Sequence, residues 1–341
     1  MAKKVTIKDV ATAAGVSVTT VSIVLNGKGA SVPKATQERI FRAAEELQYT
    51  PNHTARSLAM GRTSTVGVIV PSITNFFFAE LVRLLQGEFL KYGYEIVLCN
   101  NEESAELDLR YIRSLKGRNI DGLIFAPSAQ ILEAENEDVF KKTLEKLHLP
   151  FLFLDRYVKG YPYIAIDNAD GGYRLADYLL EKGHTRIGAV TGPLRLNSSA
   201  NRLKGVKKRL AEAGVALPNE YVYEGQYDIE TGERAAEALL RTDVTAIFAF
   251  SDMQAYGVYK KLKELGKRVP EDISVVGFDD NVYSALLDTP LTTMRQPLKE
   301  LAAATVQTML AMIRGEKVAQ KEKMPARLVE RESVRRLENE L

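Results

Sequence analysis

A chain of 341 residues is too long for one ordinary domain and long enough for two or three, each with its own hydrophobic core. The net charge of +2 says little, but residues 1–62 carry nine Lys and Arg against four Asp and Glu, while the remaining residues have a net charge of −3. This distribution favours a polyanionic partner at one end only. The single cysteine, Cys99, excludes an intramolecular disulfide.

No apolar run in the sequence reaches the length of a membrane span. The N-terminal sequence MAKKVTIKDV also lacks the apolar core of a signal peptide. We therefore expect a cytoplasmic protein. Cys99 lies in the apolar run YEIVLCN, where a lone thiol is typical of a small hydrophobic residue rather than of a nucleophile.

The stretch 7–26 predicts two short helices joined by a tight turn. Apolar residues recur at helical spacing in its first half, at Ile7, Val10, Ala11 and Ala14. Gly15 then supplies the left-handed residue that ends a helix, and Ser17 can cap the next one. The second helix has an inward face of Val21, Val24 and Leu25 and an opposite face of Thr19, Ser22, Ile23 and Asn26. This pattern favours a helix-turn-helix whose second helix suits the DNA major groove, with a small three-helix core without a ligand as the alternative.

A third helix is predicted over 33–49, where apolar residues share one face, and Pro51 ends it. Asn52 can cap a further short helix with the sequence HTARSLAM, and the residues GRTST that follow are typical of a linker. We expect three parts: an all-α helix-turn-helix headpiece over 1–50, a hinge helix with its linker over 51–65, and a core over 66–341.

From Val66 onward short apolar runs alternate with amphipathic helices, which is the pattern of an α/β fold. The runs VGVIV, EIVLC, GLIFA and FLFLD form one series, and IAIDN, IGAV, YVYEG, AIFAF and SVVGF form a second, with one of its helices expected over 202–213. Strands so continuously apolar belong to parallel sheets that helices cover on both faces. Two such sheets imply two lobes and a cleft between them, with ligand-binding groups at the carboxyl ends of the strands.

These features resemble the lactose-repressor (LacI/GalR) type family of bacterial transcriptional regulators. The similarity is carried, in this order, by TIKDVATAAGVSVTTVSIVLN, PNHTARSLAMGRTSTVGVIVP, NFFFAELV, DGLIFAPS, FLDR, GYRLADYLLEKGHTRIGAVTGP, FSDMQAYGV, VPEDISVVGFDD and TTMRQP. It spans essentially the whole chain. The resemblance implies a headpiece, a hinge helix and a two-lobed core similar to periplasmic sugar-binding proteins. It also implies a repressor whose affinity for operator DNA is controlled by a small sugar-like effector.

In this family the second helix lies in the major groove, and a leucine of the hinge helix wedges between base pairs in the minor groove. The resemblance assigns DNA contacts to Thr6, Val18, Thr19, Thr20, Ser22, Ile23, Asn26, Asn52, His53, Ala55, Arg56 and Leu58. Leu58 matches the wedge, and a linker leucine buried against the core is the alternative. Ile23 stands where many relatives have Arg or His, so the second helix has no side chain for a bidentate guanine contact. The operator sequence is therefore open at this point.

The resemblance places the effector between the lobes and assigns it Phe77, Phe78, Asp155, Arg156, Arg202, Tyr227, Ser251, Asp279 and Gln296. An aromatic face in the loop after the first strand can stack on the apolar side of a sugar ring. Asp155 and Arg156 suit a polyol, because a carboxylate accepts from two hydroxyls and a guanidinium donates in a rigid fork. Ser251 stands where sugar-binding relatives often have Asn, so no particular sugar is indicated. Each residue singly has an alternative role in a salt bridge or a helix cap.

An enzyme is the natural alternative for a two-lobed α/β chain. The sequence has no nucleophile elbow and no GxxxxGK phosphate loop, and His53, His148 and His184 lack metal-ligand spacing. We therefore expect no catalytic residue, no metal and no cofactor. A periplasmic transport receptor is a second alternative, which the headpiece and the missing signal peptide disfavour.

One headpiece buries too little surface to be specific, so we expect a homodimer that reads a pseudopalindromic double-stranded operator. Helices near 78–90 and Leu265 are candidates for the dimer surface, unless they are buried against their own sheets. The segment 331–341 is too short for a tetramerisation bundle. The sequence leaves open which effector binds, whether it induces or corepresses, and whether a protein corepressor takes part.

Overall fold

The structure is a computed structural model that describes residues 5–25, 29–49 and 62–338. The chain divides into two compact units, Met1–Thr63 and Ser64–Leu341. Three helices, α1 (Ile7–Ala14), α2 (Val18–Leu25) and α3 (Lys34–Glu46), with a short 3-10 turn at Gly29–Ser31, build the first unit. Their buried side chains form one small core of Val10, Ala11, Ala14, Val21, Val24, Ile40 and Ala43.

Local signals set the turn between α1 and α2. The Thr6 backbone N–H donates to Asp9 Oδ2 at 2.8 Å and fixes the start of α1. Gly15 follows with a φ of +64° and ends this helix, and the Thr20 N–H donates to Ser17 Oγ at 3.1 Å at the start of α2. The expected helix-turn-helix is confirmed. Among the described residues no single helix is long and apolar enough to cross a membrane, and only the α1 and α2 pair, bent by 103°, passes that test jointly.

The second unit contains two six-stranded sheets, each the centre of a lobe. The sheet of lobe 1 has the order β11-β5-β4-β3-β1-β2 and is parallel throughout. Its strands are β1 (Thr65–Val70), β2 (Glu95–Asn100), β3 (Gly122–Phe125), β4 (Phe151–Leu154), β5 (Tyr163–Ile166) and β11 (Lys321–Met324). Its helices are α5 (Phe76–Leu90), α6 (Ala105–Gly117), α7 (Ala134–Glu145) and α12 (Leu298–Ile313).

The sheet of lobe 2 has the order β12-β10-β9-β8-β6-β7, and its edge strand β12 runs antiparallel to β10. Its strands are β6 (Ile187–Thr191), β7 (Val222–Glu224), β8 (Ala246–Ala249), β9 (Ser274–Asp279), β10 (Thr292–Arg295) and β12 (Arg327–Val329). Its helices are α8 (Asn168–Glu181), α9 (Asn197–Glu212), α10 (Ile229–Leu239) and α11 (Asp252–Glu264).

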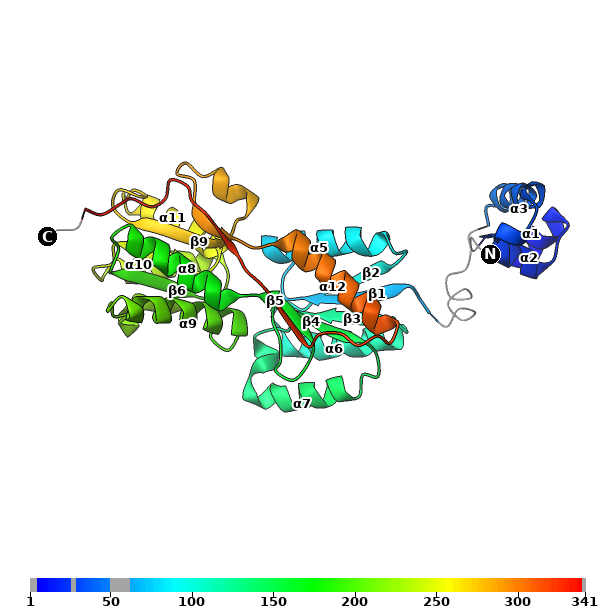
Figure 1. Cartoon of the computed structure of the whole chain (residues 1–341), viewed down its shortest axis with the longest axis horizontal. Helices are drawn as coiled ribbons and strands as arrows, with labels where there is room; N and C mark the ends of the chain where they lie inside the picture. Colours follow the sequence, from blue (N-terminus) through cyan, green and yellow to red (C-terminus); the bar gives the residue numbers. More distant parts are fainter. Residues whose placement is uncertain (1–4, 26–28, 50–61, 339–341) are drawn as a thin grey trace. The chain divides into compact units, whose positions relative to one another are not determined.

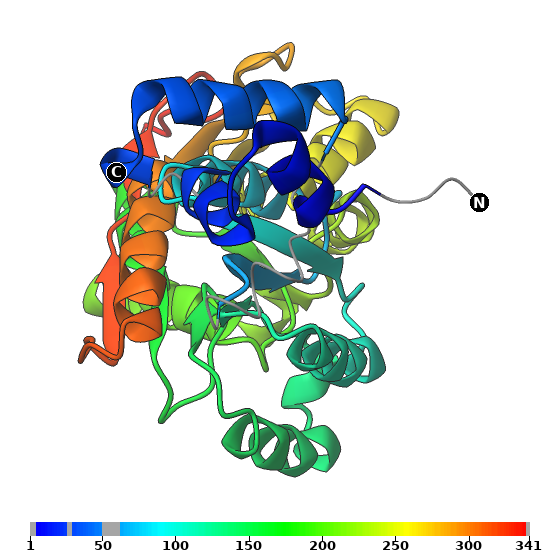
Figure 2. The ribbon, with the colours of Figure 1, turned by 90° about the vertical axis from the view of Figure 1, so that its right-hand side faces the viewer.

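Helices cover both faces of each sheet, as the continuously apolar strands predict. In lobe 1, α5 and α12 lie on one face and α6 and α7 on the other, and in lobe 2 the pairs are α8 with α9 and α10 with α11 (Figure 1). After a quarter turn the orange α12 and the teal helices of lobe 1 again lie on opposite sides of the strands (Figure 2). The central strands β1, β3, β4, β8 and β9 are almost wholly buried.

The chain crosses between the lobes three times: after β5, between β10 and α12, and between β11 and β12. Each lobe is therefore assembled from separate stretches of the sequence. These three crossovers are the covalent connections between the two lobes.

Three sequence expectations are wrong in detail. The run IAIDN belongs to lobe 1, because β5 pairs with β4 and β11, and the chain enters lobe 2 only after it. Strand β12 breaks the parallel pattern of its sheet. The helix expected over 202–213 begins at Asn197, so Arg202 lies in its second turn rather than at a strand end.

The helices of lobe 2 cross at glycines. A Cβ on Gly205 of α9 would lie 2.0 Å from the carbonyl oxygen of Ala169, and one on Gly172 of α8 would lie 2.2 Å from that of Arg202. The two backbones therefore touch, which also fixes where Arg202 points.

We expect Gly205→Val to lower the free energy of unfolding by about 4 kcal/mol, because a side chain has no space at this crossing. Denaturant unfolding followed by circular dichroism measures it. Gly117→Ala is the control, since a Cβ there meets nothing within 4 Å, and it should be neutral or slightly stabilising. Equal stability of both variants would contradict the close crossing.

Candidate functional site

The exposed face of α2 is the first candidate surface. Val18 and Ile23 are 39% and 36% exposed, Thr19 is also exposed, and Thr20 and Ser22 are half-buried. Thr6 lies at the exposed start of α1, where its Oγ1 donates to Asp9 Oδ2 at 2.7 Å. The other residues expected to contact DNA lie outside the described residues: Asn26, Asn52, His53, Ala55, Arg56 and Leu58.

The second candidate site is a small cavity between the lobes. All nine residues expected around an effector line it: Phe77, Phe78, Asp155, Arg156, Arg202, Tyr227, Ser251, Asp279 and Gln296. Asn75, Ser198 and Phe250 complete the wall and were not assigned to the effector from the sequence. The cavity is small, with a volume of about 30 Å³.

The carboxyl ends of strands from both sheets lie at this cavity. The residues at or just after strand ends are Asp155, Arg156, Ser251, Asp279 and Gln296. Phe77 and Phe78 lie in the first turn of α5 rather than in a loop, because Asn75 Oδ1 accepts from the Phe77 N–H at 3.0 Å and caps the helix. The signal for Asn75 was present in the sequence, since Asn is a preferred helix cap.

Arg202 is the buried cation of the site. Its Nε donates to Asn168 Oδ1 at 3.1 Å, its Nη1 donates to the Phe250 carbonyl oxygen, and its guanidinium lies 3.3 Å from the Phe278 ring centroid. Burial lowers the pKa of Arg202, an effect that nearby Tyr227 and the carboxylates Asp279, Asp155 and Asp252 oppose. Asn168, Phe250 and Phe278 therefore hold this guanidinium in one orientation.

Asp279 is the second charged group on the lobe 2 side. Gln296 Nε2 donates to its Oδ1 at 2.6 Å, and the Asp252 N–H donates to its Oδ2 at 3.4 Å. Burial and the neighbouring Asp252 charge raise the pKa of Asp279 well above its usual range. Asp252 has stronger partners, Ser284 Oγ at 2.5 Å and Thr293 Oγ1 at 2.6 Å, so Asp279 is the carboxyl of the pair that takes up a proton first.

Asp155 and Arg156 face the cavity from lobe 1. Arg156 Nη1 lies 2.8 Å from Glu103 Oε1 and donates to the Pro127 carbonyl oxygen at 3.2 Å. Its guanidinium also lies 5.5 Å from the Phe78 ring centroid. Burial raises the pKa of Asp155, and Arg156 and Arg202 act against that rise. Arg156 thus forms a salt bridge with Glu103 and lies beside Asp155 on the cavity wall.

Tyr227 and Ser251 have structural partners as well as a place in the wall. Tyr227 Oη lies 2.6 Å from Ser199 Oγ, and Ser251 Oγ accepts from the Gln254 N–H at 3.2 Å as the cap of α11. By contrast, Ser198 Oγ and Gln296 Oε1 are buried and have no hydrogen-bond partner within the described part of the chain. Buried polar atoms normally have partners, so these two point to a polar ligand or ordered water in the cavity.

A wider groove of about 700 Å³ forms the mouth of the cavity and shares Asn75, Phe78, Arg156 and Tyr227 with it. Its charges are mostly negative: Glu102, Glu103, Glu133, Asp228 and Glu230 stand against Arg156 and Arg195. Both arginines are paired with carboxylates, since Arg195 lies 3.1 Å from Glu133. The mouth therefore presents a surplus of carboxylates.

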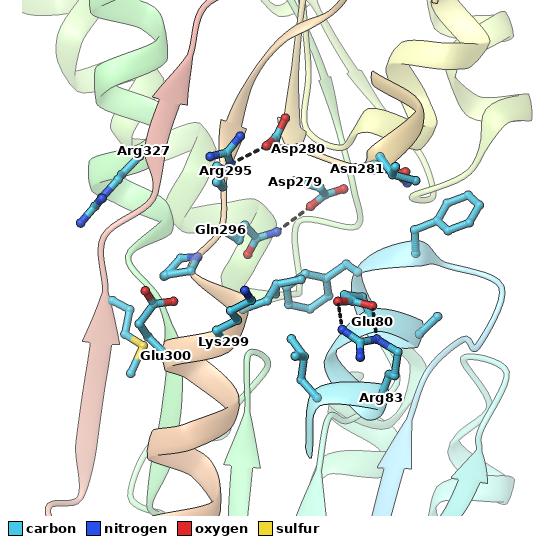
Figure 3. A pocket seen from close by; sticks show the side chains of 18 of the residues that line it. Glu80, Arg83, Asp279, Asp280, Asn281, Arg295, Gln296, Lys299, Glu300 and Arg327 are labelled. Atoms are coloured by element: carbon cyan, nitrogen blue, oxygen red, sulfur yellow. Dashed lines mark hydrogen bonds and ion pairs between the residues drawn. The ribbon is translucent and has the colours of Figure 1, made fainter. Parts of the chain in front are cut away.

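A third space of about 1020 Å³ adjoins the cavity through Phe77, Asp279 and Gln296, which line both. Figure 3 shows it with the Gln296 to Asp279 hydrogen bond, the Arg83 to Glu80 pair and the Arg295 to Asp280 pair. Its cations Arg83, Arg295, Lys299 and Arg327 are matched by Glu80, Asp279, Asp280 and Glu300. The lining of this space therefore has no surplus of positive or negative side chains. No cluster of metal-ligating side chains occurs within residues 5–25, 29–49 and 62–338.

Known proteins match both units. A family model described as bacterial regulatory proteins, lacI family, matches residues 6–52, and a periplasmic binding protein-like domain matches residues 176–334. The chain is 36% identical to the HTH-type transcriptional repressor PurR of Aliivibrio salmonicida over 91% of this chain and 92% of that protein. It is also 36% identical to the ribose operon repressor of Halalkalibacterium halodurans over 98% of both chains. The crystal structure of the lac repressor dimer bound to operator and the anti-inducer ONPF superposes with a TM-score of 0.87, at 29% identity over 98% of this chain and 100% of that chain.

A helix-turn-helix headpiece joined to a two-lobed core with an interlobe cavity defines a DNA-binding regulator with a ligand-binding core. The sequence identity over nearly the whole chain shows the family: the chain belongs to the lacI family of bacterial regulatory proteins. It is a DNA-binding transcriptional regulator, and its relatives are repressors rather than enzymes. The resemblance and the α/β fold with its helical headpiece are confirmed.

Proposed function

We propose that this chain is a cytoplasmic, homodimeric repressor that binds a pseudopalindromic operator. Its affinity for the operator changes when an uncharged sugar-like effector enters the interlobe cavity. The supporting observation is the cavity itself, because nine residues from separate stretches of both lobes converge on it. The proposed organisation is a headpiece over 1–50, a hinge helix with linker over 51–65, and a core over 66–341. The DNA contacts are those expected from the sequence, with Leu58 as the minor-groove wedge.

The size of the cavity connects effector binding to movement. Pockets for small molecules are usually roughly 300 Å³ or more, while this cavity holds about 30 Å³. An effector that enters the cavity, beyond the groove of about 700 Å³ at its mouth, therefore requires the lobes to separate around the crossovers or the side chains at the mouth to move. A ligand that favours one lobe arrangement shifts the population of the regulator toward it, and operator affinity changes with that population.

A mobility-shift titration tests this function. Duplexes that the purified protein binds are selected from a pool of random sequence. The enriched duplex is then titrated with the protein in the absence and in the presence of ribose, glucose, cellobiose or hypoxanthine. We expect an enriched palindrome and a change in its affinity with one of the neutral sugars. A response to hypoxanthine alone would indicate a purine effector in place of a sugar. The proposal would be overturned if the selection enriched no DNA sequence.

The acidic mouth predicts discrimination against phosphorylated effectors. We expect ribose and glucose to bind at least about tenfold more tightly than ribose 5-phosphate and glucose 6-phosphate, because the surplus carboxylates repel a dianion. Calorimetric titration measures both members of each pair. The difference should shrink at high salt, since ions screen exposed charges. Tighter binding of the phosphates would contradict this prediction.

A further inference from the structure

Within α2 (Val18–Leu25) the exposed arc combines apolar and hydroxyl side chains and contains no charged, amide or imidazole group. Asn26, which the sequence places on the same face, lies outside the described residues. With 100° per residue, the residues follow one another around this arc in the order Val18, Ser22, Thr19 and Ile23. Val18 and Ile23 form its two edges and are 39% and 36% exposed, whereas Val21 and Val24 on the other side are at most 2% exposed. The first pair is thus free of the headpiece core that holds the second pair.

The chemistry of the major groove leaves few partners for such an arc. Threonine and serine hydroxyls can bond to any base or to a phosphate, so they discriminate weakly. The bidentate contacts that select guanine or adenine require Arg, Lys, Asn or Gln, which Val18–Leu25 lacks. The C5-methyl group of thymine is the apolar group that the major groove offers. Two exposed branched aliphatic side chains therefore match thymine methyls and no other base edge.

We propose that Val18 and Ile23 read thymine methyl groups in each operator half-site, which makes them specificity-determining residues of α2. This inference rests on the proposed function, in which α2 lies in the major groove. The two side chains are five residues apart, about 7.5 Å along the helix axis, and lie at opposite edges of the arc. The operator half-site therefore carries a thymine for each side chain, at two separate positions that the selected sequence identifies.

Deoxyuridine provides the direct test, because it differs from thymidine only by the missing methyl group. The half-site is first selected from random duplex DNA with the full-length protein. Each thymine in it is then replaced singly by deoxyuridine, and the Kd is measured by fluorescence anisotropy. We expect about a fourfold loss of affinity at each methyl that Val18 or Ile23 covers, as for the removal of one buried methyl group. Replacing such a thymine by cytosine should weaken binding, and 5-methylcytosine should restore part of it.

Variants connect the methyl groups to the two side chains. Ile23→Ala should abolish the deoxyuridine effect at one position and Val18→Ala at another, while Ile23→Val should retain most of it. Thr19→Ser removes the only other methyl group on the arc, and Phe41→Ala removes a 51% exposed side chain on α3, so neither should change the deoxyuridine pattern. Thermal unfolding confirms that each variant is folded.

The outcomes separate the two proposals. A selected operator that is insensitive to deoxyuridine at every position overturns the methyl readout while the repressor function stands. The same holds if the sensitivity persists unchanged in Ile23→Ala and Val18→Ala, or moves with Thr19→Ser. Failure to enrich any DNA overturns the proposed function itself, and the inference falls with it.

Discussion

Replacing Arg202 by methionine is expected to lower the free energy of unfolding by about 3 to 5 kcal/mol and to abolish effector binding. The guanidinium is buried, and its removal leaves the Asn168 and Phe250 oxygens without their donors. It also leaves Asp155 and Asp279 without the cation that they share. Denaturant unfolding and calorimetric titration of the sugar identified by the mobility-shift screen measure the two effects.

Arg209 is a matched control on the same helix. It pairs with Asp177 at 2.6 Å, but both side chains are partly exposed to solvent, so Arg209→Met should cost less than about 1 kcal/mol. Effector affinity should not change in this variant. If Arg202→Met is as stable as Arg209→Met and still binds the sugar, then Arg202 neither holds the lobes nor contacts the effector.

Asp279→Asn should stabilise the protein, unlike Arg202→Met, and should strongly weaken effector binding. Folding raises the pKa of Asp279, so its protonated form contributes stability below about pH 4 that is lost as pH rises through the folded-state pKa. The neutral amide avoids this loss, and we expect Tm at pH 8 to rise by roughly 2 to 5 °C. Effector affinity should fall about ten- to a hundredfold, because a charge-assisted acceptor is removed.

The pH dependence distinguishes this explanation from a change in packing. The Tm advantage of Asp279→Asn should be largest at pH 8 and should shrink toward pH 4, where the wild-type carboxyl is itself protonated. Gln296 can still donate to the amide oxygen at position 279, and the substitution costs only the longer contact of 3.4 Å from the Asp252 N–H. A Tm difference that is independent of pH, or a less stable variant at pH 8, would show that the buried charge is not the cause.

The local part of the fold could be predicted because its signals are local. Gly15 and Ser17 mark the turn between α1 and α2, and apolar runs mark the central strands. Edge strands β11 and β12 carry no such signal, because KEKM and RLV are largely exposed. The lobe to which β5 belongs depends on which strands it pairs with, and no local pattern encodes that choice.

The same limit applies to the candidate site. The cavity wall was predicted through the family resemblance, and the structure gathers those residues around one space. The partners that hold them were not predicted, since Glu103, Asn168 and Asp252 act through contacts between distant segments. For Asp252 there was a partial signal, because it follows Ser251 directly after a buried strand.

The order in which the lobes are completed has a consequence for synthesis in the cell. Helix α12 covers one face of the lobe 1 sheet and β11 forms its edge, yet both come after nearly all of lobe 2 in the chain. While the ribosome makes lobe 2, this face of the nascent lobe 1 is covered by α5 alone for roughly ten to thirty seconds at the usual rate of elongation. Lobe 1 is therefore the part of the nascent chain that we expect chaperones to protect until α12 and β11 have been made.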